Sequence, residues 1–545
     1  MNSKIDTELS LALEVPEYER EKTDDLNVGF EPGDFWELIV KYSGSIIEEV
    51  KELGGTVKEL LGDYGIVRIP QRNIDRLSGL TKVLFVEKPR RLHFEVSYSK
   101  TISCISPVKN KNSLSGFGTL VGLIDSGIDY LHPEFIDENG NTRIAAIYDE
   151  ITSTVITREE IDEAISEKNE NLIRDISGHG TGVAGIAAGN SGVAYGADIV
   201  MVKLGADDFF NTARLMEGVD FCLKYAISVG RPIAINISIG NNYGAHDGTS
   251  LLETYLDYVS GVWKNSIIVG SGNEADKRIR GFVRLRKQRE TVELSVGNYE
   301  QSVSVQIWKK YWDDFRLEII LPDSRIVTIA DIQGFTAYET PYETIYVYFG
   351  DASPYSIDEE ILVVIVAKDT YVRSGLWQFV LIPVSIKDGD VDIWITGNTG
   401  TEGQTGFLIS EPETTLTIPS TAYKVITVGA YNGRTMSYAD FSGRGFTRNV
   451  VAVKPDIVAP GVDIAVPVPG GRFAKRSGTS YAAPFATGGA AILMEWGIVR
   501  GNDPYMYGEK IKAELIKNAR ELPENRIYPN PLTGWGTLCI NKNSY

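Results

Sequence analysis

Ser480 stands between small residues, at a point where a loop is predicted to turn into an apolar helix. At a helix N-terminus it would lie beside backbone N–H groups without intrahelical partners and beside the positive end of the helix dipole. Such a position suits a nucleophile whose reaction creates an oxyanion. The plainer alternative is a serine that serves as an ordinary N-cap.

Three further residues supply the groups that a reactive serine needs. A hydroxyl needs a base to become a nucleophile, and the base needs an acid that orients it. His179 lies in a glycine-rich stretch, and Asp125 directly follows a short apolar run. The amide of Asn273 could donate to an oxyanion, which in proteases is worth about 2.7–4 kcal/mol of transition-state stabilisation.

Other chemistries for these residues are less consistent with the sequence. Asp125, Ser126 and Gly127 could end a strand or form half of an aspartic-protease site, but the chain has no second Asp-Ser/Thr-Gly. His179 could be an ordinary loop histidine. The α/β-hydrolases place their histidine after the nucleophile, and no histidine follows His246 here. That fold is therefore excluded.

The elements around these residues predict an α/β fold with a parallel sheet. Helical stretches are expected between short apolar strands, and such alternation is typical of parallel sheets. Functional groups in these sheets collect at the carboxyl ends of the strands, which is where Asp125 lies. The expected strands are 120–124, 199–202, 233–237 and 267–270, and the expected helices include 212–229 and 251–264.

Residues 35–98 predict a separate ferredoxin-like module, because strands and helices follow the order β-α-β-β-α-β. An independent binding module is the plainer interpretation of this region. The segment before it, residues 1–34, begins with a polar and acidic stretch, which predicts a loose N-terminal arm. The expected strands are 36–42, 56–61, 64–69 and 82–87, and the expected helices are 45–53 and 73–77.

Residues 281–418 predict an all-β insert, a β-sandwich or jelly roll, because many short alternating strands replace the helical pattern. The α/β domain is accordingly expected in two parts, 99–280 and 419–545. Four of the eight tryptophans fall in the insert: Trp308, Trp312, Trp377 and Trp394. We interpret them as sandwich core, with a carbohydrate-binding stack as the alternative.

The composition restricts the classes of function. The 545 residues are 43% hydrophobic and 23% charged, as in globular proteins. A formal net charge of −19 argues against non-specific binding to nucleic acid or to an anionic membrane. Three widely spaced cysteines predict neither a disulfide framework nor a zinc site.

No targeting or membrane segment is expected. The chain has no uninterrupted run of 18 apolar residues, so no transmembrane helix is predicted. Its first residues lack a basic region followed by an apolar one, which predicts synthesis in the cytoplasm without a signal peptide.

These motifs together resemble the subtilisin-like (subtilase) serine proteases. The chain order of Asp125, His179 and Ser480 is the one found in subtilisin. The resemblance implies that Ser480 is the nucleophile, His179 the general base, Asp125 its orienting acid and Asn273 the oxyanion donor. It rests on residues 125–129, 178–185, 454–461 and 478–484.

The resemblance also implies where substrate binds. Subtilases bind a substrate segment as an added β-strand. The matching segment here comprises Ser238, Ile239 and Gly240. The opposite wall of the specificity pocket is expected from Val269, Gly270, Ser271 and Gly272.

The architecture further resembles the Csp germination proteases of clostridial spores, which carry a prodomain and a jelly-roll insert in a subtilase core. This resemblance implies a protein substrate, the proform of a spore cortex-lytic enzyme, and a spore-associated location. It also implies that the prodomain is cut autocatalytically and stays bound as inhibitor and folding chaperone. The cut is expected between Phe94 and Lys100.

Two alternatives remain at this stage. A non-catalytic, germinant-sensing pseudoprotease would use the same scaffold, but such proteins usually lose a triad residue and this chain retains all three. A general intracellular subtilase would degrade many proteins, and the long insert speaks against it. No cofactor or metal site is expected. Many subtilases bind calcium, but no ligand set can be assigned to residues of this chain.

Overall fold

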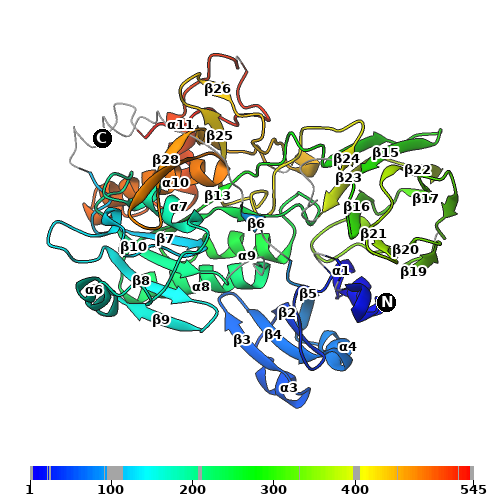
Figure 1. Ribbon diagram of the computed structural model, residues 1–545, viewed down its shortest axis with the longest axis horizontal. Coiled ribbons are helices and arrows are strands. Elements are labelled where there is room, and N and C mark those ends of the chain that lie inside the picture. The colour runs from blue at the N-terminus through cyan, green and yellow to red at the C-terminus, as the bar shows by residue number, and fades with distance from the viewer. Residues whose placement is uncertain are drawn as a thin grey trace. The chain divides into compact units, whose positions relative to one another are not determined.

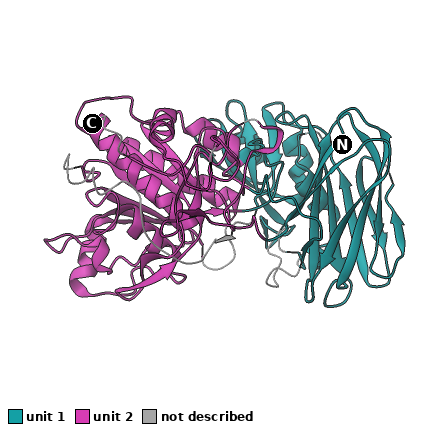
Figure 2. Ribbon diagram, turned by 90° about the horizontal axis from the view of Figure 1, so that it is seen from above, with its two compact units in different colours: residues 1–91, 241–251, 277–415 teal, residues 92–240, 252–276, 416–545 magenta. Residues whose placement is uncertain are grey.

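In a computed structural model, the chain divides into two compact units (Figure 2). Unit 1 contains residues 1–91, 241–251 and 277–415, and unit 2 contains residues 92–240, 252–276 and 416–545. Each unit therefore combines segments that lie far apart in the sequence. The described residues are 4–20, 22–23, 26–90, 93–94, 114–205, 211–330, 332–396, 405–450, 452–525 and 527–540.

Unit 2 is built on a nine-stranded, mostly parallel sheet (Figure 1). Every pairing from β25 to β8 is parallel, and the edge strands β26 and β9 are antiparallel. The predicted α/β fold is confirmed. In spatial order the strands are β26 (Ser437–Tyr438), β25 (Ile426–Asn432), β13 (Asn265–Gly270), β11 (Ile233–Ile237), β7 (Leu120–Asp125), β10 (Asp198–Lys203), β8 (Ile144–Asp149) and β9 (Thr154–Thr157), with β27 (Ile457–Pro460) also paired to β25.

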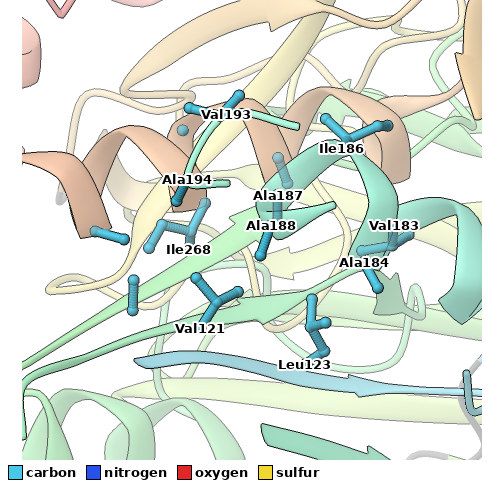
Figure 3. Packing of buried hydrophobic residues seen from close by; sticks show 14 of the residues in the cluster. Val121, Leu123, Val183, Ala184, Ile186, Ala187, Ala188, Val193, Ala194 and Ile268 are labelled. Carbon is cyan, nitrogen blue, oxygen red and sulfur yellow. The ribbon is translucent and has the colours of Figure 1, made fainter. Parts of the chain in front are cut away.

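Both faces of this sheet are covered by helices, as the continuous apolar strands require. On one face, Val121 and Leu123 of β7 share a core with α7 (His179–Ala188) and α10 (Thr479–Met494). Figure 3 shows Val121 and Leu123 beside Ala184 and Ala188 of α7. On the other face packs α8 (Thr212–Ser228), whose Gly218 lies against Ile124 and Val202. The helices α6 (Arg158–Glu167), α9 (Leu251–Val259) and α11 (Glu509–Asn518) complete the α-helices that are described after residue 113.

α10 and the turn after it have the length and composition of a membrane span, over Thr479–Val499. Of the apolar window in this stretch, 78% is buried inside the fold. Small residues let it approach its neighbours closely: a Cβ on Gly488 would lie 2.6 Å from the carbonyl oxygen of Ala187. It is the core helix of a large domain.

The N-terminal part of unit 1 has the ferredoxin-like order that the sequence predicts. Its antiparallel strands lie in the order β5, β2, β4 and β3, and a short strand β1 also pairs with β2. The elements are β1 (Phe30–Glu31), β2 (Phe35–Tyr42), α3 (Ile47–Glu52), β3 (Thr56–Leu60), β4 (Tyr64–Pro70), α4 (Ile74–Ser78) and β5 (Val83–Glu87).

The expectation of a loose N-terminal arm is wrong for residues 4–20. They form α1 (Thr7–Glu14) and the short α2 (Glu17–Arg20), and Asp6 caps α1 by accepting a hydrogen bond from Leu9 N. The acidic residues did not prevent burial, because they have buried basic partners: Glu8 pairs with Lys88 at 2.8 Å. The apolar side chains of α1 share a core with strands of the insert, through Leu9, Leu11, Ala12, Tyr346, Tyr348, Leu362 and Val364.

The insert in unit 1 consists of two antiparallel sheets that pack on one core, which includes Val305, Ile307, Leu317 and Ile319. The predicted β-sandwich is confirmed, and its description as a jelly roll stays a prediction. One sheet runs β14 (Arg280–Arg284), β23 (Asp390–Thr396), β16 (Ser302–Lys310), β21 (Asp358–Ala367), β20 (Glu343–Phe349), β19 (Gly334–Glu339); the other runs β18 (Ile326–Thr328), β17 (Asp314–Ile320), β22 (Gly375–Ser385), β15 (Glu290–Val296), β24 (Gly406–Phe407).

The insert's tryptophans do not all belong to its core. Trp377 is fully buried in the sandwich core, as predicted. Trp394 is also fully buried, but it lies outside that core and stacks on His246. Trp312 is 38% exposed, so the core interpretation is wrong for it. Trp312 falls in the turn between β16 and β17, where the alternation that buries every second side chain has ended.

Candidate active site

The first functional pair in unit 2 is His179 and Asp125. β7 ends at Asp125 and α7 begins at His179, and their side chains are 1% and 2% exposed. His179 Nδ1 lies 2.7 Å from Asp125 Oδ1. A carboxylate on Nδ1 holds the proton there, so that Nε2 is the nitrogen able to take a proton from a nucleophile.

Glycines permit this close approach of α7 to β7. A Cβ on Gly180 would lie only 2.2 Å from the carbonyl oxygen of Gly127 and 3.0 Å from Asp125 Oδ1. Gly178, the N-cap of α7, has a φ of 70°, which favours glycine. The glycines on either side of His179 are therefore required by the geometry of the His179–Asp125 pair.

Ser480 lies in the first turn of α10, where backbone N–H groups have no intrahelical partner. The N-cap of this helix is Gly478, without a side-chain cap bond. The N-cap alternative for Ser480 is therefore wrong. The ring of Tyr481, the next residue, lies 5.4 Å from the ring of His179, which places the histidine beside this turn.

Ser480 is also joined to the predicted substrate segment. Its Oγ donates to the carbonyl oxygen of Ser238 at 3.1 Å, and Ser238 Oγ donates to the carbonyl oxygen of Ser480 at 3.0 Å. Ser238 is itself held by Asn236 of β11, whose amide donates to its hydroxyl at 2.7 Å. The serine is thus positioned against the end of a rigid, buried strand.

Asn273 lies on the other side of the same turn. Its Oδ1 accepts hydrogen bonds from the backbone N–H of Thr479 at 2.9 Å and from Thr479 Oγ1 at 3.3 Å. These bonds fix the orientation of the amide, so that Nδ2 is the atom able to donate to an oxyanion formed at Ser480. The backbone N–H of Ser480 is a second donor of this kind.

Asp175 is a positioning residue that the sequence reasoning missed. Its carboxylate accepts from Ser126 Oγ at 2.7 Å, from Gly178 N at 2.9 Å and from Thr181 N at 2.8 Å. It therefore ties the start of α7 to the residue next to Asp125. The available signal was an acidic residue just before a helix start, where a carboxylate is favoured by the free N–H groups.

The predicted substrate segment pairs with a strand from the linker. β12 (Ile239–Gly240) is antiparallel to β6 (His93–Phe94), with Ile239 opposite Phe94 and Gly240 opposite His93. This pairing is the strand addition that the sequence predicts for a bound peptide. Of the predicted cleavage region, Phe94 is described, and the residues from Glu95 to Lys100 lie outside the described part.

The predicted opposite wall lies at the end of β13. Val269 and Gly270 close this strand, and Ser271 N donates to Val428 O at 3.0 Å. Gly272 N donates to Thr479 Oγ1 at 3.2 Å, which joins the wall to the turn that carries Ser480. The structure thus brings the predicted triad, the oxyanion donor and both predicted pocket walls together in unit 2.

In the residues that the structure describes, no three or more His, Cys, Asp or Glu side chains group in a way that could hold a metal ion. The arrangement of Asp125, His179, Asn273 and Ser480 needs none for acyl transfer, because base, orienting acid and oxyanion donors are all supplied by the chain.

Fold and site define a serine protease of the subtilisin type. Residues 116–333 and 385–536 match the family model described as the subtilase family, more than half of the chain. The chain belongs to this family. Residues 3–90 match the model of the Csp protease B prodomain. The solved structure of the CspB protease of Clostridium perfringens is 36% identical, covers 80% of this chain and 94% of that chain, and superposes with a TM-score of 0.77.

Curated relatives match over shorter stretches. Subtilisin-like protease 3 of Arthroderma otae is 35% identical over 136 residues, which are 24% of this chain and 28% of that protein. The minor extracellular protease Vpr of Bacillus subtilis (strain 168) is 32% identical over 110 residues, 19% of this chain and 13% of that protein. The matched stretch thus spans less than a third of these relatives.

Proposed function

We propose that this chain is an active serine endopeptidase in which Ser480 attacks the peptide carbonyl. The observation that carries this proposal is the buried 2.7 Å bond between His179 Nδ1 and Asp125 Oδ1, beside the helix turn that holds Ser480. Hydrolysis of a protein substrate by the wild type, and its loss in Ser480→Ala, tests it. Equal hydrolysis by both proteins would assign the activity to another group or a contaminant.

The chemistry follows from the geometry. Ser480 Oγ, which donates to Ser238 O in the structure, turns to His179 Nε2 and gives up its proton as it bonds to the substrate carbonyl carbon. The oxyanion receives hydrogen bonds from Asn273 Nδ2 and from the Ser480 N–H. His179 then protonates the leaving amine, and the acyl-enzyme is cut by a water that His179 deprotonates.

We propose further that the chain cuts itself after Glu95. In the β6–β12 pairing Phe94 stands opposite Ile239, one residue short of Ser238. Ser480 Oγ donates to the carbonyl of Ser238, which directly precedes Ile239, so we expect the cut just beyond the paired residues His93 and Phe94. The next residue in the chain is Glu95, and the bond is Glu95–Val96. N-terminal sequencing of the wild type tests this proposal, and a start other than Val96 contradicts it.

We also propose that the cut prodomain stays bound to the protease as its inhibitor and folding chaperone. Support comes from unit 1, in which prodomain and insert share one core that contains Trp36, Leu38, Tyr346 and Val364. Lys22 Nζ also donates to the carbonyl oxygen of Ala367 at 3.0 Å, and Tyr346 of the insert donates to Glu19. These contacts do not depend on the bond that is cut. Co-elution of the fragment with the processed enzyme on gel filtration is expected.

For the biological role we propose limited proteolysis of a cortex-hydrolase zymogen in germinating spores. The Csp protease B prodomain match and the 36% identity to a CspB protease support it. Incubation with the purified zymogen, followed by mass mapping, should give one cut. Many cuts in unrelated proteins would favour a general subtilase. No cut despite a reactive Ser480 would favour a regulatory scaffold.

A further inference from the structure

Unit 1 contains a cavity of about 100 Å³, and none of the proposed catalytic residues lines it. A volume of this size holds roughly three water molecules or one small organic group. Residues of the prodomain, of the segment 241–251 and of the insert line it together. Its charged lining residues are one basic residue, Arg90, and five acidic ones, Asp6, Glu87, Asp351, Asp358 and Glu360. Lys310 neutralises Asp358 at 2.9 Å, and the cavity keeps an excess of acidic groups.

Two of the lining carboxylates are each fixed through one oxygen atom. Asp6 Oδ1 accepts from Leu9 N at 3.3 Å and from Lys88 N at 3.0 Å, and Glu87 Oε2 accepts from Leu251 N at 3.1 Å. Among the residues that the structure describes, the other oxygens, Asp6 Oδ2 and Glu87 Oε1, have no hydrogen-bond partner. These side chains are only 7% and 3% exposed. A carboxylate oxygen so deeply buried requires a donor.

The buried charges around this cavity do not balance. Four carboxyl groups face Arg90, those of Glu87, Glu8, Asp6 and Glu360. Glu8 takes the short contacts, with Lys88 at 2.8 Å and with Arg90 Nε at 3.2 Å. The nitrogens of Arg90 lie 3.7 Å from Asp6 Oδ2 and 3.8 Å from Glu87 Oε1, too far for hydrogen bonds. Two basic side chains thus face four acids, and a further cation would neutralise part of the excess.

We propose that this cavity is a binding site for a small organic cation of the guanidinium or alkylammonium class, whose N–H groups donate to Asp6 Oδ2 and Glu87 Oε1. In the part of the chain that the structure describes, no three acidic, His or Cys side chains group in a way that could hold a metal ion. An organic cation instead reaches separate carboxylates with separate N–H groups. Aromatic lining residues, among them Phe85, Trp308 and Tyr348, favour such a cation over a neutral molecule.

A ligand in this cavity would act on the retention of the prodomain. Asp6 and Glu87 belong to the prodomain, whereas Trp308 and Glu360 belong to the insert. The ligand therefore binds the assembled unit and not its separated parts, and by mass action it favours the assembled state. Binding requires neither the activity of Ser480 nor the proposed self-cleavage.

Isothermal titration calorimetry of methylguanidinium into the full-length Ser480→Ala protein tests the proposal. At pH 9 the two acids with raised pKa values, Asp6 (about 8) and Glu360 (about 7), are ionised. Methylguanidinium should bind to one site with a Kd of about 1 mM or tighter, within the limit for so small a ligand. Methylurea, its neutral isostere, should bind at least about tenfold more weakly, because it lacks the charge.

Glu87→Gln keeps an acceptor for Leu251 N but removes the charge, and it should weaken methylguanidinium binding at least about tenfold. Glu31→Gln is the matched control, because Glu31 pairs with Arg68 at the surface of the same unit and does not line the cavity. It should bind methylguanidinium as the parent protein does. Asp6→Asn replaces Glu87→Gln if that variant does not fold, with the same expected loss.

Equal affinities for methylguanidinium and methylurea would overturn the proposal, as would equal weakening in Glu87→Gln and Glu31→Gln. Binding of Ca²⁺ without binding of methylguanidinium would overturn the class of ligand. The effect on assembly has its own measurement. Saturating methylguanidinium should raise the midpoint of thermal unfolding of unit 1 in the Ser480→Ala protein, and adding Glu87→Gln should abolish this rise. An equal rise in both proteins would contradict binding at the cavity.

Discussion

Asp175 and Ser126 are joined by a hydrogen bond of 2.7 Å, which ties the loop before α7 to the end of β7. Through this bond and those to Gly178 and Thr181, the carboxylate sets the distance between His179 and Asp125. The proposed catalytic pair therefore depends on a second carboxylate, that of Asp175, which positions the pair and takes no part in the proposed reaction.

Asp175→Ala should lower kcat about 100-fold, because misplacement of a catalytic group by about 1 Å has an effect of that size. KM should change little, since the substrate segment is untouched. Asp137→Ala is the matched control, because Asp137 also accepts from backbone N–H groups but in a surface loop. Steady-state kinetics on both variants checks this prediction. A raised KM with unchanged kcat in Asp175→Ala would contradict the positioning role.

Asn273→Ala should lower kcat by about 10²–10³-fold with little change in KM, because the lost hydrogen bond forms only to the transition state. Asn265→Ala is the control: this buried amide donates to Val259 O and Val262 O, away from the site. It should affect unfolding more than kcat. If both variants lose activity equally, the effect of Asn273 is structural.

The proposed catalytic residues stand out in the sequence because their neighbours are constrained locally. The glycines around His179 and the small residues around Ser480 are required by close approaches, such as that of Gly180 to Gly127 O. The periodicity of short strands likewise predicted the ferredoxin-like module and the sandwich. These features are encoded within a few consecutive residues.

Features that depend on distant partners could not be predicted. The acidic N-terminus forms α1 because Lys88 and Arg90 neutralise Glu8 although they lie 80 and 82 residues later in the sequence. Asp175 acts through a tertiary contact with Ser126, 49 residues earlier in the chain. The sequence around such residues shows no periodicity that would reveal these contacts.

The buried charges of unit 1 predict a stability that falls as pH rises. Burial raises the pKa of Asp6 to about 8, although Arg90 lowers it, and burial raises the pKa of Glu360 to about 7. Burial also raises the pKa of Glu87. Glu8, Lys88 and Arg90 belong to the same cluster of buried charges. A carboxyl group whose pKa is raised in the folded state stabilises the fold fully at a pH below its pKa in the unfolded chain, which is near 4. This stabilisation is lost as the pH rises toward the pKa in the folded state.

Thermal unfolding measured from pH 4 to pH 9 should therefore show a midpoint for unit 1 that declines as the pH rises. Each of these groups lowers the free energy of unfolding by at most about 1.4 kcal/mol per pH unit. Asp6→Asn imitates the neutral acid and can still accept from Leu9 N and Lys88 N. It should flatten the decline. A midpoint that rises over this range, or an equally steep decline in Asp6→Asn, would contradict the assignment.

The reactivity of Ser480 is the central claim, and intact-mass spectrometry after treatment with a fluorophosphonate tests it most directly. The processed wild type should gain one adduct, located by peptide mapping on Ser480, and Ser480→Ala should gain none. His179→Ala should label far more slowly, because the serine loses its base. A wild type that remains unlabelled after removal of the prodomain, or an adduct that persists in Ser480→Ala, would contradict the account.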